Sequence, residues 1–440
     1  MARLKKLGNK TFLRDLHQIF NFDSSEEFEK KKARLFPIGK TNDENQTTSI
    51  FLSSLSAVKE YREDLLNKIG IKKINNRNIQ LHVYTEIPSK SGEERPDGLI
   101  VVTSGINDPI IEWISFVESK IGNQKIDDEQ IENYITFGQD LGIENIITVS
   151  NQLVSTPYET PVVRLTKKKF NLYHWSWISL SVTAGRLLKS GTIDDDDHVY
   201  ILSELRRYFN THIGIKSYEG MEKDWKEVTV EFSDKSSKGN KDIIEKIINS
   251  YKQKEKDICL QLTDGTGHYV QLKTNVKTRE DLMKLSLEKN KIISSTFFIN
   301  ENPNKTFTLN IDFIARKITC YSRCTIEHGK SKAQTSRLIN LFSNDISNED
   351  DIFIGAIYPR RSSLNSSYKS LGELLIEKEE GNYSILNKDH GDVVKEFEIK
   401  MVDDLGVDFH KPQVIVRRLE SLTKVYLLYN FNIIKSNLFF

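Results

Sequence analysis

The chain has 440 residues, of which 38% are hydrophobic and 28% charged. This apolar content is enough for packed cores and excludes a disordered chain, and the length favours two or three domains. The 63 basic and 62 acidic residues almost cancel, so a surface that binds nucleic acid would have to be local. Three cysteines in so long a chain favour a reducing compartment, and no apolar run has the length of a membrane-spanning helix. The composition therefore predicts a cytoplasmic protein with no membrane partner.

Helices and strands alternate through the first half of the chain. Residues 1–40 predict a helical extension, and Thr47, Thr48 and Ser49 predict the cap of a long amphipathic helix that stops at Gly70. The elements predicted after it are strands at 78–87, 96–102 and 112–121, a helix at 127–141, strands at 146–150 and 173–180, and a helix at 199–209. A helix between two strands implies a crossover and a parallel pair, which predicts a mixed α/β fold.

The pattern changes in the second half. The polar segment from Asp234 to Lys241 predicts a loop or linker, and we place the domain boundary between residues 212 and 242. A first domain is then predicted over 41–215 and an α+β domain, for recognition or assembly, over 242–440. The strands predicted in this second domain are a hairpin around Asp264-Gly265 and runs at 306–326, 393–402, 413–418 and 424–434.

Two strand-like runs carry acidic residues at one end. Pro96-Asp97 opens the first run, and Glu118-Ser119-Lys120 closes the second, which is apolar. Side chains alternate along a strand, so Glu118 and Lys120 point to the same side and Ser119 points away. If the two strands pair, Asp97 joins them. Two acids beside an amine at the end of a buried strand suit metal-assisted hydrolysis of a phosphodiester.

Charge assigns a role to each group in this hypothesis. Asp97, Glu118 and the backbone carbonyl of Ser119 would give oxygen ligands to Mg²⁺ or Mn²⁺. The metal would polarise a phosphoryl oxygen and lower the pKa of a bound water. Lys120 would orient or deprotonate that water, or neutralise charge that develops on phosphorus. The alternative is a solvated strand end with a surface ion pair, because acid-x-lysine strings recur elsewhere in this charged chain.

These residues resemble the motifs of the PD-(D/E)XK nuclease superfamily, whose members have the restriction-endonuclease-like fold. Pro96-Asp97 is similar to the first motif and Glu118-Ser119-Lys120 to the second. The resemblance covers the region from residue 40 to residue 210 and implies a mixed sheet flanked by helices. Because the superfamily is highly divergent, it implies a fold and a reaction type and leaves the substrate open.

The resemblance also implies three further site residues. Glu129 to Tyr134 resembles the Gln-x-x-x-Tyr element of RecB-like members, which implies that Gln130 and Tyr134 face the site and touch substrate or metal-bound water. The alternative for Gln130 is an ordinary exposed helix residue. Members often carry another acid on the helix before the first strand. Glu44 and Glu60 are the candidates here, and we prefer Glu44 because it stands where the helix begins.

The resemblance thus implies a divalent-metal-dependent endonuclease that hydrolyses phosphodiester bonds, in DNA rather than RNA by the habit of the family. Chains of this build often occur in bacterial defence against phage, which is an analogy. The rival interpretations are a catalytically silent module that binds nucleic acid or a partner, another metal-dependent phosphoesterase, and an RNA-cutting toxin-like effector. With no glycine-rich phosphate loop, an ATP-driven step would need an ATPase or helicase partner, and a homo-oligomer stays open.

Other clusters favour structural roles. His174, Trp175 and Trp177 could stack bases, but an aromatic core strand is favoured. The acids from 194 to 197 favour a helix start. Two cysteines at 320 and 324 on one strand would lie about 13 Å apart, too far to share a zinc ion with His328. Local basic groups that together could flank a backbone-binding groove are Lys167-Lys168-Lys169, Arg206-Arg207, Arg360-Arg361 and Arg417-Arg418.

Overall fold

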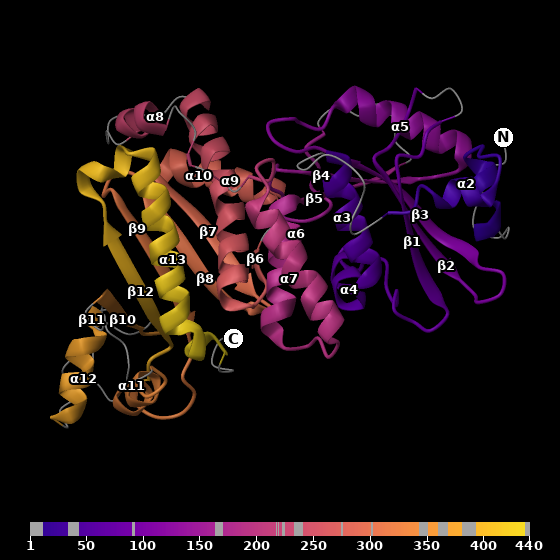
Figure 1. The fold of residues 1–440 in the computed structure, drawn as a ribbon. Coiled ribbons are helices and arrows are strands. Elements are labelled where there is room, and N and C mark those ends of the chain that lie inside the picture. Colours follow the sequence, from indigo (N-terminus) through magenta and orange to yellow (C-terminus); the bar gives the residue numbers. More distant parts are fainter. Residues whose placement is uncertain are drawn as a thin grey trace. The chain divides into compact units, whose positions relative to one another are not determined.

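The chain divides into two compact units, Met1–Ser217 and Tyr218–Phe440. This division falls inside the range predicted for the domain boundary. Each unit holds one sheet with helices beside it (Figure 1), which confirms the mixed α/β class. The computed structural model describes residues 12–33, 44–89, 93–162, 170–216, 218, 220–221, 225–232, 241–273, 276–300, 302–342, 351–359, 368–380 and 393–435.

The first unit is built on a five-stranded sheet in the order β1-β2-β3-β4-β5. The first three strands form an antiparallel meander, and β4 and β5 run parallel to β3. Helix α5 (Asp128–Leu141) makes the crossover from β3 to β4 that a parallel pair requires. The strands span Ile79–Thr85, Gly98–Ser104, Ile110–Ser119, Asn145–Ser150 and Asn171–Ser176.

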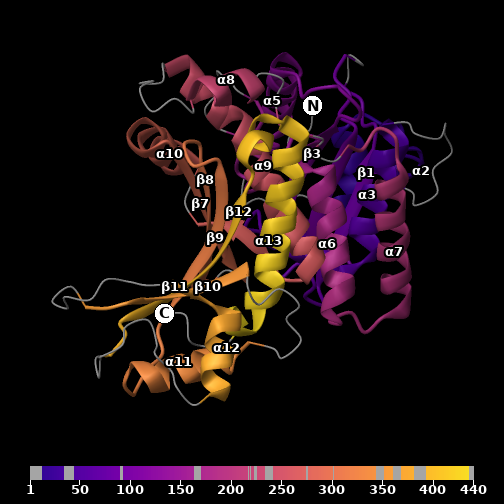
Figure 2. The same cartoon turned by 90° about the vertical axis from the view of Figure 1, so that its left-hand side faces the viewer.

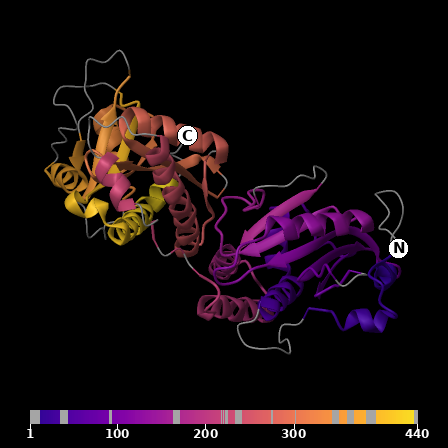
Figure 3. The ribbon, with the colours of Figure 1, turned by 90° about the horizontal axis from the view of Figure 1, so that it is seen from above.

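Helices cover both faces of this sheet, as seen from above in Figure 3. Along β2, Ile100 and Val102 belong to one buried cluster, and Leu99 and Val101 belong to the other. Both faces are therefore apolar, as expected for a sheet buried on two sides. The first cluster packs under α3 (Glu44–Ala57), α4 (Lys59–Asn67), α6 (Trp177–Ser190) and α7 (Asp196–Thr211); the second packs under α1 (Leu16–Ile19), α2 (Ser25–Glu29) and α5.

Two sequence predictions in the first unit need correction. The strand predicted over 173–180 ends at Ser176, whose Oγ accepts a hydrogen bond from Ser179 N and caps α6. Thr47 to Ser49 do not cap the next helix, because α3 is already helical from Glu44, and Val58 separates it from α4. The described part of the predicted helical extension holds a 3-10 helix, Leu13–Asp15, followed by α1 and α2, and residues 1–11 and 34–43 lie outside the described residues.

The second unit holds a seven-stranded antiparallel sheet in the order β11-β10-β12-β9-β8-β7-β6. Its strands span Val270–Leu272 (β6), Ile292–Ile299 (β7), Asn302–Asp312 (β8), Lys317–Cys324 (β9), Ile352–Ile357 (β10), Tyr368–Ser370 (β11) and Glu396–Asp404 (β12). Its helices are α8 (Trp225–Phe232), α9 (Lys241–Thr266), α10 (Val276–Asn290), α11 (Ser331–Ile339), α12 (Leu371–Glu379) and α13 (Pro412–Lys435). Figure 2 shows α13 running along the sheet and α12 beside β10 and β11.

Two predictions in the second unit were wrong. Asp264-Gly265 is part of α9 and not a hairpin turn. The runs at 413–418 and 424–434 are one helix, α13. The reason is helical spacing of the buried side chains, which overrides the β-branched and aromatic content of the segment. The buried positions of α13 that repeat at this spacing are Ile415, Leu419, Leu422 and Tyr426.

A buried ionic cluster lies on α9. The side chain of Lys254 is 0% exposed, and its Nζ lies 2.7 Å from Asp257 Oδ2 and also contacts Glu420 of α13. On the same helix, Glu255 accepts hydrogen bonds from Arg279 Nε and from the Ser295 hydroxyl, each at 2.8 Å. Buried charges are tolerated only when they are paired, so these contacts fix α9 to its neighbours.

Among the described residues, no helix combines the length and the apolar character that a membrane crossing requires.

Candidate active site

The antiparallel pairing of β2 with β3 brings the two acidic segments together. Gly98 pairs with Val117, so Asp97, one residue before β2, lies next to the end of β3. Asp97 Oδ2 accepts hydrogen bonds from Ser119 N at 2.8 Å and from Ser119 Oγ at 3.2 Å. The register of a single hairpin is therefore sufficient to place Asp97 beside the Glu118-Ser119-Lys120 segment.

Glu118 and Lys120 meet at the end of β3. The Glu118 side chain is 1% exposed, and its Oε1 lies 2.5 Å from Lys120 Nζ. The intervening Ser119 turns its hydroxyl to Thr48 of α3, with Ser119 Oγ 2.6 Å from Thr48 Oγ1. Strand pairing continues through Lys120, whose N–H donates to Val149 O of β4 at 2.8 Å. The acid and the amine are thus held by the central strands of the sheet.

Of the two further acids considered, Glu44 reaches this group. Its Oε1 lies 3.3 Å from Lys120 Nζ, and its Oε2 accepts a hydrogen bond from Ile121 N at 3.3 Å. Glu60 instead lies on α4, where its Oε2 is 2.8 Å from His198 Nδ1 of α7. Three acids and one lysine from α3, the start of β2 and the end of β3 therefore converge.

The Gln130 and Tyr134 side chains lie on α5 beside the same group. Gln130 Nε2 donates to the Tyr134 hydroxyl at 2.9 Å, and that hydroxyl donates to the backbone carbonyl of Arg95 at 3.2 Å. Burial, and then the charge of nearby Glu118, raise the pKa of Tyr134. Tyr134 is thus adjacent to Glu118, while the polar contact of Gln130 is with Tyr134.

One carboxylate oxygen in this group has no hydrogen-bond partner. Glu118 Oε2 is buried and accepts no hydrogen bond from the described residues. The Tyr134 hydroxyl, which also lies 3.2 Å from the Arg95 carbonyl, is close enough to Glu118 to lower the pKa of that carboxyl against the larger effect of burial. A buried polar atom without a partner is unfavourable and indicates a missing group such as water or an ion.

The group holds more acidic than basic side chains. Glu44, Asp97 and Glu118 face Lys120 alone, so three carboxylates share one ammonium. Burial, and then the charge of Glu118, raise the pKa of Asp97 to about 8. Burial raises the pKa of Glu118 against the opposing effect of Lys120. For Lys120, burial lowers the pKa, but the surrounding carboxylates outweigh it and raise the pKa overall.

These features fit a hard divalent cation. The described residues hold no group of three or more His, Cys, Asp or Glu side chains arranged as metal ligands. Mg²⁺, however, commonly binds through one or two carboxylates and completes its shell with water and substrate oxygens. Asp97 and Glu118 supply those two carboxylates, Glu118 Oε2 lacks a partner, and a cation would favour the ionised form of both acids, whose pKa values are raised without it.

A second layer of contacts supports the site and was not predicted from the sequence. Trp177 Nε1 donates to Lys120 O at 2.9 Å. Asn151 Nδ2 donates to the carbonyls of Gly122 and Gly214 at 2.9 and 2.8 Å, which joins the loop after Lys120 to the segment after α7. These partners lie far apart in the sequence, and nothing in their local spacing signals the contacts.

The other clusters take structural roles in the described part of the chain. Trp175 and Trp177 are buried at 3% and 0% exposure, and His174 is buried with its Nδ1 2.8 Å from Thr148 Oγ1, so the core interpretation is confirmed. Asp195 caps α7 by accepting from Asp197 N and His198 N. Cys320 and Cys324 lie in the core of the second unit on β9. The basic groups at 167–169 and 360–361 lie outside the described residues.

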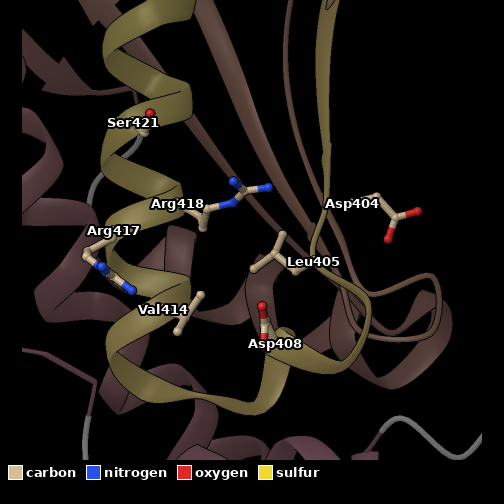
Figure 4. Close-up of a pocket in the computed structure, with 7 residues that line it drawn as sticks. All are labelled: Asp404, Leu405, Asp408, Val414, Arg417, Arg418 and Ser421. Carbon is tan, nitrogen blue, oxygen red and sulfur yellow. The ribbon is translucent and has the colours of Figure 1, made fainter.

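The second unit has a pocket of about 430 Å³ at the start of α13, shown in Figure 4. Its acids are already paired: Asp404 lies 3.0 Å from Lys317 Nζ, and Asp408 lies 2.6 Å from Lys411 Nζ. Arg418 contacts Asp403. This pocket therefore lacks the excess of carboxylates that marks the site in the first unit. It is lined by Asp404, Leu405, Asp408, Val414, Arg417, Arg418 and Ser421.

Comparison with protein families, with characterised proteins and with solved structures finds no match to this chain.

Proposed function

We propose that the chain is a divalent-metal-dependent nuclease with a restriction-endonuclease-like domain in its first unit. The observation that carries this proposal is the convergence of Asp97, Glu118, Lys120 and Glu44 at the end of β3. The order α3, α4, β1, β2, β3, α5, β4 supports the proposal, because the superfamily resemblance implies a mixed sheet flanked by helices. The proposed substrate is DNA rather than RNA, by the habit of that superfamily.

The residues divide the work by charge. Asp97, Glu118 and the Ser119 carbonyl would hold Mg²⁺ or Mn²⁺, and Glu118 Oε2 is the oxygen that has no other partner. When bound, the ion supplies polarisation of a phosphoryl oxygen and a more acidic bound water. The carboxylates around Lys120 raise its pKa, and we assign it the role of a cation toward the charge developing on phosphorus. Glu44 holds Lys120 in place through the contact at 3.3 Å.

A cleavage assay tests the proposal. Purified protein is incubated with supercoiled plasmid, single-stranded DNA and RNA in Mg²⁺, in Mn²⁺ and in EDTA. We expect metal-dependent cleavage of DNA that Asp97→Asn abolishes. Asp108→Asn is the matched control. Asp108 lies in the turn between β2 and β3, at the other end of these strands from the site, and pairs there with the exposed side chain of Arg14.

The pattern of cleavage distinguishes the proposal from its rivals. Cleavage of RNA alone would favour an RNA-cutting effector. Binding without cleavage in every metal would favour a catalytically silent module, within which an ATPase or helicase partner would be sought. Cleavage that Asp97→Asn leaves intact would place the reaction elsewhere in the chain.

A further inference from the structure

Arg95 lies at the rim of the proposed nuclease site. Its backbone carbonyl accepts the hydrogen bond from the Tyr134 hydroxyl at 3.2 Å. It stands two residues before Asp97, and the following Pro96 restricts it to extended backbone. Alternation along an extended segment directs residues two apart to the same side. The backbone of Arg95 is therefore held next to the acids of the site, and its exposed side chain starts from that point.

Glu86 connects Arg95 to the other side of the site. One Glu86 oxygen, Oε1, accepts a hydrogen bond from Asn45 Nδ2 at 3.0 Å, and the same oxygen lies 3.4 Å from Arg95 Nη1. Asn45 follows Glu44 directly on α3. The Glu86 N–H donates to Asp97 O at 3.1 Å, and Glu86 itself has a φ of 52°, an uncommon left-handed conformation for glutamate. Glu86 is thus held in a position that faces both acid-bearing segments.

The ion pair between Arg95 and Glu86 is long and exposed to solvent. The Arg95 side chain is 59% exposed and the Glu86 side chain 32% exposed, and their charged atoms are 3.4 Å apart. Exposed pairs of this kind contribute little to stability. A phosphate can instead take two parallel hydrogen bonds from one guanidinium, which is a stronger arrangement. Exchanging the Glu86 carboxylate for a phosphate is therefore favourable for Arg95.

The charges of the site create a need for such a cation. A nucleic-acid backbone that approaches Glu44, Asp97 and Glu118 meets three carboxylates, while the Lys120 ammonium is already shared between two of them. A bound metal would offset the carboxylates that hold it and the one phosphate that it contacts. A neighbouring phosphate needs a partner at the rim, where the exposed guanidinium of Arg95 lies.

We propose that Arg95 binds a backbone phosphate of the nucleic-acid substrate adjacent to the one that is cleaved, and that Glu86 occupies Arg95 until the substrate replaces it. This proposal rests on the proposed nuclease function and names a residue that binds the substrate at that site. Glu86 then competes with the substrate, so its charge weakens binding. A guanidinium that contacts phosphate contributes to affinity regardless of base sequence and makes that affinity depend on salt.

The test measures binding in the full-length Lys120→Ala protein, so that cleavage does not interfere. Fluorescence anisotropy in Mg²⁺ reports the Kd for a labelled 20-mer duplex and for the matching single strand at several salt concentrations. Adding Arg95→Ala should raise Kd about tenfold and reduce the slope of log Kd against log salt by about one. Adding Glu86→Gln, which keeps an acceptor for Asn45, should lower Kd. Adding Arg14→Ala, which breaks the exposed pair with Asp108, should change neither quantity.

Three results would overturn the proposal. Arg95→Ala could bind as tightly as its parent, Glu86→Gln could weaken binding as much as Arg95→Ala, or neither probe could bind at all. Cleavage by the protein with Lys120 intact is measured separately. If that protein binds both probes through Arg95 and cuts neither, the nuclease function fails and the assignment of Arg95 to phosphate binding is still supported.

Discussion

Lys120 Nζ lies 2.5 Å from Glu118 Oε1, and the two side chains come from alternate positions at the end of one central strand. The carboxylate is buried and the ammonium is the only cation among four charged groups that converge from three segments. This pair places a carboxylate where a metal would bind and keeps one positive charge beside it.

Asp97 predicts a pH dependence of stability in metal-free protein. Its pKa is raised from about 4 in an unfolded chain to about 8 in the folded protein. Between these values the folded state binds more protons than the unfolded state, so the free energy of unfolding falls as pH rises. Thermal unfolding in EDTA should show Tm decreasing from pH 5 to pH 9, with a smaller decrease in Asp97→Asn. Equal slopes in the two proteins would contradict this.

Glu44 predicts a loss of activity that its neighbour on α4 does not share. Glu44→Gln removes the charge beside Lys120 Nζ, which loosens the ammonium, and we expect kcat to fall about tenfold with little change in KM. Glu60→Gln alters the contacts with His198 and Lys59, neither of which belongs to the site, and serves as the control. Steady-state cleavage kinetics measure both variants, and similar rates for the two would show that Glu44 does not act at the site.

Replacing Thr48 by valine should lower the stability of the protein without changing its charge. The Thr48 hydroxyl lies 2.6 Å from Ser119 Oγ in a buried contact, and valine at position 48 would leave Ser119 with one partner fewer. Ser119 Oγ keeps its contact with Asp97, so the loss is that of one hydrogen bond, and urea denaturation of Thr48→Val should give a free energy of unfolding lower by about 0.5–1.5 kcal/mol. The control is Thr136→Val, at an exposed bond within α5, which should stay within about 0.5 kcal/mol of wild type.

The central pair could be predicted because its determinants are local. Alternation places Glu118 and Lys120 on one side of a strand, and a single hairpin register brings Asp97 beside them. Glu44 came from the superfamily resemblance and was preferred to Glu60 for its position at the start of a helix. Thr48 and Asn151 were missed because their partners are distant in the sequence, and only the folded chain brings them into contact.

The errors at α6 and α13 have a common cause. The segments that form α6 and α13 are rich in aromatic and β-branched residues, which favour strands in isolation. In the folded chain they bury side chains at helical spacing, and a cap at Ser176 and a proline at the first turn of α13 fix where the helices begin. Packing and capping therefore make these two segments helical, although their local propensity favours strands.

We expect the stability of the second unit to depend on the buried charge of Lys254. Lys254→Met leaves Asp257 buried without its partner, because the Lys254 side chain is 0% exposed and lies 2.7 Å from that carboxylate. Breaking such a pair costs about 3–5 kcal/mol. Calorimetry should show a lower Tm for the second unit, whereas Lys246→Met, at an exposed pair on the same helix, should leave it unchanged. An unchanged Tm in Lys254→Met would show that the ion pair contributes nothing net.

The most direct test of the central claim is the single-turnover rate of cleavage of a labelled DNA duplex in Mg²⁺ by wild type and by Lys120→Ala. Lys68→Ala, which breaks a lysine pair with Asp64 on α4, is the control for removing a lysine from the same unit. We expect cleavage by wild type and by Lys68→Ala, and a single-turnover rate at least about 100-fold lower in Lys120→Ala. Equal rates in Lys120→Ala and wild type, or no cleavage by wild type of any nucleic acid in any divalent metal, would contradict the proposed nuclease function.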